Sequence, residues 1–223
     1  KPKPMVEIAG KPILWHIMKT YSYYGYNKCV LCLGYRGDVI IDYFCNYELR
    51  NKDFTLKLGT NEITVHNKHT ESDWEITFAE TGLNSMTGSR VKKIQKYVDD
   101  EVFMLTYGDG VSDVDIEKLI EFHKSHGKIA TMTGVLPPSR FGEIIEDKNI
   151  VKSFSEKPLT HQGGMINGGY FVFNKKIFDY ISESPDCILE RKPLEDLVND
   201  NQLCVYKHDG FWQCMDTFRD FEY

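Results

Sequence analysis

Apolar residues recur along the first part of the chain with two different spacings. Within residues 12–24, Ile13, Ile17 and Tyr21 stand at every fourth position, which predicts an amphipathic helix. The following apolar run, residues 29–33, is short and continuous, as in a buried strand. The chain therefore begins with a helix followed by a strand.

The middle of the chain continues this alternation. Residues 101–107 are almost entirely apolar, which is typical of a strand buried on both faces of a parallel sheet. Residues 114–126 follow with a helical stripe that includes Leu119 and His123, and residues 128–136 predict another strand. This order predicts an α/β fold: a Rossmann-like, mainly parallel mixed sheet flanked by helices. We expect further strands at 153–158, 165–173 and 203–206, and further helices at 38–44 and 193–198.

Composition narrows the class of protein. The 223 residues contain no Pro/Ser-rich linker or repeat, so we expect residues 1–223 to form a single domain. Asp and Glu total 33 against 27 Lys and Arg, and this excess of acid argues against broad nucleic-acid binding. No apolar run approaches the roughly 20 residues that a membrane span needs. We therefore expect neither a nucleic-acid nor a membrane partner.

The six cysteines are too sparse for a disulfide scaffold. Cys29 and Cys32 have CxxC spacing, but they lie on a predicted strand, where positions three apart point to opposite faces. Both are therefore interpreted as reduced core cysteines rather than zinc ligands. Reduced thiols are typical of a cytoplasmic protein, which is the location we expect.

Asp109 is the first candidate for chemistry. It stands in Gly108-Asp109-Gly110, directly after the apolar strand 101–107. Ligands of open α/β sheets bind outside the carboxyl ends of the strands. A carboxylate there suits Mg²⁺, and the flanking glycines allow a bulky ligand to approach closely. The alternative is an ordinary turn in which Asp109 caps nearby amides.

Three further acids invite a metal interpretation. Asp113 and Asp115 have D-x-D spacing, although acids that open a helix also stabilise its dipole. Asp216 follows the aromatic segment 211–212 and could bring a second carboxylate to the same Mg²⁺. On its own, an Asp before Thr is more often a turn or a helix cap.

Basic and small polar residues mark possible phosphate and base contacts. Lys3 and Lys157 each stand next to proline, where a rigid lysine could clamp a phosphate. Residues 81–90 are rich in amides and hydroxyls before a predicted helix, which suits a nucleobase or phosphate but also any well-capped loop. His123 and His126 are read as helix C-terminal residues, with His123 facing the core, rather than as a zinc pair.

Taken in order, these segments resemble the sugar-1-phosphate nucleotidylyltransferase family, over nearly the whole chain. The SMTGSR segment and the FWQCMDT ending resemble the cytidylyl branch of that family. The matching stretches are KPKPMVEIAGKPILWHIMK, LGYRGDVI, ETGLNSMTGSR, TYGDGVSDVDI, RFG, SFSEKP, MINGGYFVFN and GFWQCMDTFRD.

The resemblance implies a role for each matching position. Lys3 corresponds to the lysine that holds the nucleotide phosphates, and Asp109 with Asp216 to the pair that ligates Mg²⁺. Glu156 corresponds to the acid that binds sugar hydroxyls, and Lys157 to the lysine that grips the sugar phosphate. The pyrimidine is expected at Thr81, Gly82, Gly88 and Arg90, the sugar pocket at Asn167 and Gly168, and a further substrate contact at Gly142.

The implied reaction is Mg²⁺-dependent transfer of a cytidylyl group from CTP to glucose 1-phosphate, giving CDP-glucose and pyrophosphate. An ionised sugar phosphate attacks the α-phosphorus in line, without a covalent enzyme intermediate or a general base. In bacteria this product feeds the deoxysugars of surface polysaccharide such as lipopolysaccharide O-antigen, and members of the family assemble into symmetric oligomers. We therefore expect a homo-oligomer.

Other readings stay open at this stage. A uridylyl- or thymidylyltransferase would use the same machinery, and a glycosyltransferase could use Asp113 and Asp115. A regulatory subunit would bind ligand without turnover. The family also carries a strand and a glycine-rich loop of the type GGxGTR before the segment that matches Lys3, and this sequence begins after them. We accordingly expect a single domain that lacks its N-terminal strand and that loop.

Overall fold

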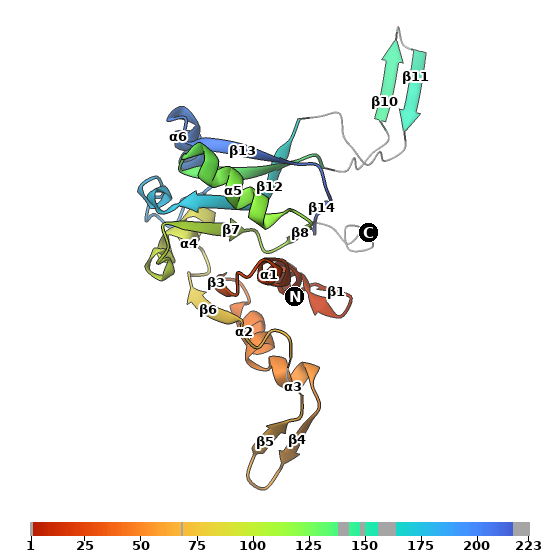
Figure 1. The fold of residues 1–223 in the computed structure, drawn as a ribbon, viewed down its shortest axis with the longest axis vertical. Coiled ribbons are helices and arrows are strands. Elements are labelled where there is room, and N and C mark those ends of the chain that lie inside the picture. The colour runs from red at the N-terminus through yellow and green to blue at the C-terminus, as the bar shows by residue number, and fades with distance from the viewer. Residues whose placement is uncertain (1, 68, 138–142, 148–149, 156–163, 216–223) are drawn as a thin grey trace. The chain divides into compact units, whose positions relative to one another are not determined.

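The computed structural model of the chain describes all residues except 1, 68, 138–142, 148–149, 156–163 and 216–223. The described residues form helices and sheets (Figure 1), as the sequence pattern predicts. Every predicted helix and strand is present, with ends that differ from the expectation by a few residues. Among the described residues, no helix is both long and apolar enough to cross a membrane.

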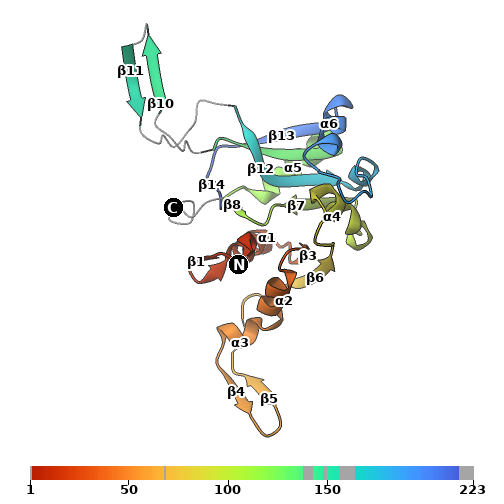
Figure 2. The ribbon, with the colours of Figure 1, turned by 180° about the vertical axis from the view of Figure 1, so that it is seen from behind.

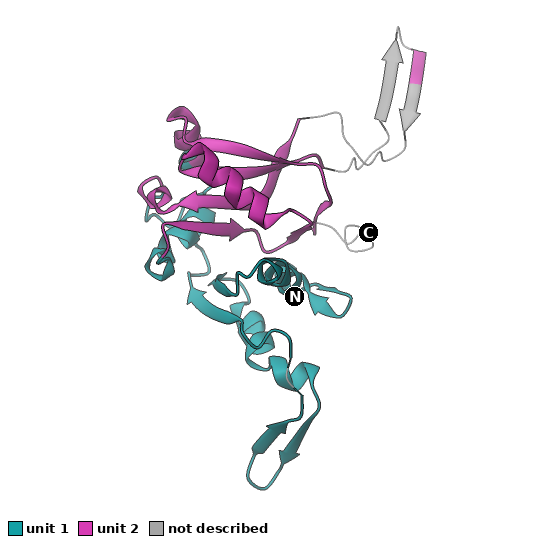
Figure 3. Ribbon diagram, viewed as in Figure 1, with its two compact units in different colours: residues 1–99, 181–193 teal, residues 100–180, 194–223 magenta. Residues whose placement is uncertain are grey.

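The chain divides into two compact units, which are coloured separately in Figure 3. Unit 1 contains residues 1–99 and 181–193, and unit 2 contains residues 100–180 and 194–223. Neither unit is a continuous stretch of sequence, because residues 181–193 return to unit 1 after most of unit 2 has been formed. The single domain expected from the sequence stays a prediction.

Unit 1 is built around a pair of parallel strands, β3 (Lys28–Leu33) and β6 (Glu75–Glu80). Leu33 is paired with Glu80, so the carboxyl ends of both strands lie side by side. A buried cluster of Met5, Leu14, Met18, Leu33 and Ile40 joins β3 to its neighbouring helices. The helices of unit 1 are α1 (Ile13–Tyr23), α2 (Gly37–Cys45), α3 (Tyr47–Asn51) and α4 (Thr87–Lys93). Unit 1 also contains the short strands β1 (Glu7–Ile8) and β2 (Lys11–Pro12) and the 3₁₀ turns η1 (Lys3–Met5) and η2 (Gln95–Tyr97).

A hairpin in unit 1 was not predicted from the sequence. It consists of β4 (Phe54–Lys57) and β5 (Glu62–Val65), which pair antiparallel. Apolar side chains on it are exposed, including Leu56 at 43% and Leu58 at 82%. The hairpin forms a separate two-stranded sheet, and these side chains leave apolar surface exposed.

Unit 2 contains a four-stranded mixed sheet with the order β13-β9-β12-β7. Its strands are β7 (Val102–Thr106), β9 (Ala130–Val135), β12 (Ile166–Asn174) and β13 (Leu203–His208). β9 and β13 are parallel, whereas β12 runs antiparallel to both β9 and β7. The expectation that residues 101–107 form a strand buried within a parallel sheet is therefore wrong: β7 is half-buried, because it lies at the end of this order and pairs with an antiparallel neighbour.

Helix α5 (Ile116–His126) covers one face of this sheet, in front of it in Figure 1 and behind it in Figure 2. The predicted stripe is confirmed, since Leu119 has no exposed surface and His123 is 3% exposed. Gly127 ends the helix with a φ of +63°, a conformation that glycine adopts without strain. The remaining elements of unit 2 are β8 (Gly110–Ser112), β10 (Glu143–Asp147), β11 (Ile150–Ser155), β14 (Trp212–Cys214) and η3 (Lys175–Asp179), and α6 (Lys192–Asn199) spans the boundary between the units.

Candidate active site

Lys3 lies at the start of η1 in unit 1. Pro2 before it and Met5 two residues after it are buried, and Met5 belongs to the buried cluster around β3. The backbone N–H of Val6 donates to the Lys3 carbonyl at 3.0 Å and closes the turn. The backbone of Lys3 is thus anchored while the residue itself stays exposed, which is the setting required of a lysine that meets a ligand.

At the carboxyl ends of β3 and β6, the structure brings Thr81 and Arg90 together. The Thr81 hydroxyl donates to the Leu33 carbonyl oxygen at 2.6 Å, and Thr81 is 1% exposed. The guanidinium Nη1 of Arg90 donates to the same carbonyl at 2.9 Å and to the Thr81 hydroxyl oxygen at 2.6 Å. A side chain at Gly34 would overlap the guanidinium, so glycine makes room for it. The Arg90 side chain is therefore held in one place.

Lys93 joins this group, although the sequence analysis missed it. Its ammonium donates to the Thr81 carbonyl at 2.8 Å and to the Ser85 hydroxyl at 2.7 Å. The sequence could have indicated Lys93, because residues three apart on a helix share a face and Lys93 follows Arg90 by three positions. Among the described residues neither cation has a carboxylate partner, and their hydrogen-bond acceptors are neutral oxygens. The group consequently carries positive charge that suits an anionic ligand.

The two glycines expected at the pyrimidine differ in their surroundings. Gly82 has a φ of +93°, and its N–H donates to a Glu80 carboxylate oxygen at 2.9 Å. Gly88 lies inside α4, where an added Cβ would come within 2.7 Å of the Cys187 sulfur. The nearest neighbours of Gly88 belong to residues 181–193, so packing of α4 against that segment accounts for this glycine.

In unit 2, Asp109 lies in the turn between β7 and β8. β8 pairs antiparallel with β14, and the N–H of Met215 donates to the Asp109 carbonyl at 2.8 Å. Met215 is thus tied by its backbone to the Asp109 turn. The Asp109 carboxylate is a hard oxygen donor, the kind of ligand that a divalent cation such as Mg²⁺ prefers.

Asn167 and Gly168 lie at the start of β12, at the same end of the sheet as the carboxyl end of β7. The register between β12 and β9 shifts after Asn167, and the indole N–H of Trp212 donates to the Gly168 carbonyl at 2.7 Å. The Asn167 carboxamide donates to the Tyr107 hydroxyl at 3.1 Å. The structure thus places both predicted sugar-pocket residues beside the Asp109 turn, together with Tyr107 and Trp212, which the sequence analysis did not single out.

Four predicted site residues, Gly142, Glu156, Lys157 and Asp216, lie outside the described residues. Their roles therefore rest on the sequence.

Asp113 and Asp115 each have a structural partner. The carboxylate of Asp115 accepts the backbone N–H of Lys118 at 3.0 Å and caps α5, and this hydrogen bond lowers the pKa of Asp115. Asp113 lies 3.0 Å from Nε2 of His208. The helix-opening interpretation holds for Asp115, and the D-x-D spacing requires no metal to explain it.

The two histidines of α5 converge on one hydroxyl. Nδ1 of His123 lies 2.8 Å, and Nε2 of His126 lies 2.7 Å, from Oγ1 of Thr131. The N–H of Lys128 donates to Nδ1 of His126, so its Nε2 carries the proton and donates to Thr131, whose hydroxyl then donates to His123. Burial lowers the pKa of His123 to about 4. Both histidines are accounted for by this neutral chain, and His123 faces the core as predicted.

The cysteine prediction needs one correction. Cys29 is half-buried, and burial raises the pKa of its thiol to about 12. Cys32, by contrast, is exposed rather than a core residue. Its position three residues along the same strand places it on the other face of β3, where less of the chain covers it.

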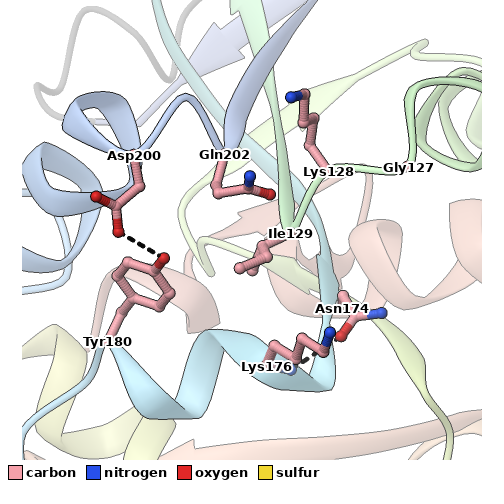
Figure 4. Close-up of a pocket in the computed structure, with 8 residues that line it drawn as sticks. All are labelled: Gly127, Lys128, Ile129, Asn174, Lys176, Tyr180, Asp200 and Gln202. Atoms are coloured by element: carbon pink, nitrogen blue, oxygen red, sulfur yellow. Dashed lines mark hydrogen bonds between the residues drawn. The ribbon is translucent and has the colours of Figure 1, made fainter.

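A pocket of about 410 Å³ opens at the opposite end of the strands of the unit 2 sheet (Figure 4). It lies before the amino ends of β9 and β13, beside the last residue of β12, Asn174. Tyr180 donates to Asp200 at its rim at 2.8 Å. Because Asn167 stands at the opposite end of β12, this pocket is separate from the candidate active site.

Comparisons with known proteins agree with the fold and the residue groups. Residues 1–221 match the family "Nucleotidyl transferase". The chain is 50% identical to a glucose-1-phosphate cytidylyltransferase of Salmonella typhi, over 99% of this chain and 85% of the relative. It is 43% identical to a probable glucose-1-phosphate cytidylyltransferase of Bacillus subtilis, over 98% of this chain and 85% of the relative. The crystal structure of HddC from Yersinia pseudotuberculosis shares the fold, with a TM-score of 0.68 at 24% identity over 100% of this chain and 88% of that chain.

This chain belongs to the nucleotidyl transferase family. The α/β fold and the enzymatic class expected from the sequence are therefore confirmed.

Proposed function

We propose that this protein transfers a cytidylyl group from CTP to α-D-glucose 1-phosphate and releases pyrophosphate. The observation that carries the proposal is the 50% identity, over 99% of the chain, to a relative named for that reaction. Two residue groups would supply the chemistry: a cationic group at the carboxyl ends of β3 and β6, and a carboxylate and carboxamide group at the carboxyl end of β7 and the amino end of β12.

The cationic group binds the nucleotide. Arg90 and Thr81, with Gly82, contact the pyrimidine, and Lys93 adds charge that attracts the triphosphate. Lys3 stabilises the charge that develops on the leaving pyrophosphate. A fixed cation is effective here because the bond to pyrophosphate breaks with negative charge moving onto the leaving oxygen.

The second group binds the sugar phosphate and the metal. Asn167 and Gly168 contact the sugar, with Glu156 on its hydroxyls and Lys157 on its phosphate. Asp109 and Asp216 hold Mg²⁺, which neutralises charge on the phosphate oxygens when bound. A phosphate oxygen of glucose 1-phosphate forms a bond to the α-phosphorus of CTP as the bond to pyrophosphate breaks. The attacking phosphate is already ionised at neutral pH and needs no general base.

We further propose that the protein works in the cytoplasm as a homo-oligomer. The six cysteines of the sequence are too sparse for a disulfide scaffold, which suits a reducing compartment. The exposed apolar side chains of the β4–β5 hairpin provide a surface that a second copy of the chain could cover.

Pyrophosphate release tests the reaction. The protein, expressed from its complete gene, is incubated with glucose 1-phosphate and CTP, UTP, dTTP, ATP or GTP, with and without Mg²⁺. We expect release with CTP that requires Mg²⁺. Preference for UTP or dTTP would contradict the base assignment while keeping the family, and binding of CTP without any release would favour a regulatory subunit.

A further inference from the structure

Tyr107 occupies the junction between the two parts of the unit 2 site. It follows β7 directly and precedes Asp109 by two residues. Its backbone N–H donates to the Gly169 carbonyl at 3.0 Å, so the end of β7 is bound to the segment of β12 that carries Asn167. One residue therefore touches the sugar-pocket strand and sits next to the turn of the candidate metal ligand.

The ring of Tyr107 fits closely against Gly169. A Cβ at Gly169 would lie 2.7 Å from Cδ2 of the ring, and the φ of +76° at this position disfavours any other residue. The ring also contacts Phe171 edge-to-face, with the centroids 5.7 Å apart. These two contacts favour the position in which the hydroxyl meets Asn167.

The Asn167 carboxamide is held between the Gly169 N–H and the Tyr107 hydroxyl. Oδ1 of Asn167 accepts the Gly169 N–H at 2.8 Å, and Nδ2 donates to the Tyr107 hydroxyl at 3.1 Å. A flipped amide would place its NH₂ against the Gly169 N–H, so this assignment is the one that satisfies both bonds. Among the described residues these are the partners of the carboxamide, which leaves one N–H for a ligand.

We infer that Tyr107 is a positioning residue for the sugar phosphate, an inference that rests on the proposed function. Its hydroxyl holds the Asn167 carboxamide so that the second N–H donates to a sugar hydroxyl. The shift in register after Asn167 serves the same end, because such irregularities re-aim side chains next to active sites. In this role Tyr107 acts through Asn167.

Tyr107→Phe removes the hydroxyl and keeps the ring, and is therefore the decisive variant. Loss of the hydrogen bond to Asn167 predicts a rise of about fivefold to tenfold in KM for glucose 1-phosphate. The values of kcat and of KM for CTP are expected to stay within about twofold, because Asn167 is assigned to the sugar phosphate. Tyr180→Phe is the matched control, since it removes a hydrogen-bonded hydroxyl at the opposite end of the same sheet.

A double-mutant cycle with Asn167→Ala separates positioning from a general structural effect. Without the carboxamide, Tyr107→Phe should cause no further rise in KM for the sugar phosphate. Additive effects of the two substitutions, an equal rise in KM for CTP, or no change in either KM would overturn the inference.

Measurements on the unsubstituted protein distinguish failure of the proposed function from failure of the role assigned to Tyr107. If it releases pyrophosphate from CTP and glucose 1-phosphate while Tyr107→Phe leaves both KM values unchanged, the proposed function stands and the role of Tyr107 is wrong. If it neither turns over nor binds glucose 1-phosphate in calorimetry, the proposed function fails, and the inference fails with it.

Discussion

The two groups of candidate site residues differ in the charge of their hydrogen-bond donors. In unit 1, the cations Arg90 and Lys93 donate to backbone carbonyls and to the hydroxyls of Thr81 and Ser85. In unit 2 the donors are neutral, since the Trp212 indole donates to the Gly168 carbonyl and the Tyr107 N–H donates to the Gly169 carbonyl. The first group is therefore built from charged donors, and the second from neutral donors and a close backbone fit at Gly169.

This difference indicates how each group recognises its ligand. Cations without carboxylate partners among the described residues attract an anion, with an affinity that salt weakens. A neutral carboxamide held between a glycine and a tyrosine selects instead by the direction of its hydrogen bonds. Substitutions in the two units should therefore affect different substrates, and the following changes test that separation.

The largest effect is expected from Asp109→Asn. The substitution keeps the size of the side chain but removes the charge that holds the metal, and should lower kcat/KM by at least about 100-fold. Pyrophosphate release measured across a Mg²⁺ titration checks this. Asp115→Asn is the matched control, because Asn caps a helix as well as Asp does and activity should be retained. Equal loss in both variants would mean that Asp109 has no special part in the reaction.

Gly169→Ala tests the claim that unit 2 is fixed by backbone shape. We expect it to lower the free energy of unfolding by about 2 kcal/mol or more, because the new Cβ meets the Tyr107 ring and the backbone φ is positive. Gly10→Ala is the control for backbone strain, since Gly10 has a φ of +77° but nothing within 4 Å of an added Cβ. Urea denaturation of both variants gives the comparison, and similar losses would argue against a tight fit at Gly169.

Arg90→Gln tests the charge of the unit 1 group. Loss of the guanidinium should raise KM for CTP about tenfold and leave KM for glucose 1-phosphate within twofold. Arg90→Lys should fall between, because it keeps the charge and loses the planar fork. Lys96→Gln removes a neighbouring cation that lies over the Tyr97 ring and should change neither value. A rise in the sugar KM with Arg90→Gln would break the separation between the units.

The smallest effect is expected from Lys93→Met. This lysine is exposed and acts as a point charge near the nucleotide, so KM for CTP should rise about threefold at low salt. The difference from the unsubstituted protein should shrink as NaCl is raised, because screening weakens an exposed charge first. A salt-independent difference would indicate a structural rather than an electrostatic role.

The sequence predicted the regular elements well, because their periodicity is local. The stripe on α5 identified Leu119 and His123 as buried residues, and both are. Strand direction was harder to predict: the apolar run before Asp109 could not reveal that its neighbour, β12, runs antiparallel. The β4–β5 hairpin was missed because its exposed apolar residues do not resemble a strand with one buried face.

For the candidate site, the sequence predicted residues for ligand contacts but not the residues that hold them in place. Asp109, Arg90 and Asn167 were predicted because they match a family pattern. Tyr107 and Trp212 were not predicted because an aromatic residue near a strand end is usually core, and their hydrogen bonds to Asn167 and Gly168 join residues far apart in the sequence. The shift in register of β12 did have a local signal, because Gly168 and Gly169 interrupt the strand and Gly169 has a φ of +76°.

The most direct test of this account is one set of KM values, for CTP and for glucose 1-phosphate, measured in Arg90→Gln and in Asn167→Ala. Each KM is taken with the other substrate saturating and Mg²⁺ constant. The account predicts that Arg90→Gln raises KM for CTP alone and that Asn167→Ala raises KM for glucose 1-phosphate alone. The reverse pattern, or equal rises in both values for both variants, would contradict the assignment of the nucleotide to unit 1 and the sugar phosphate to unit 2.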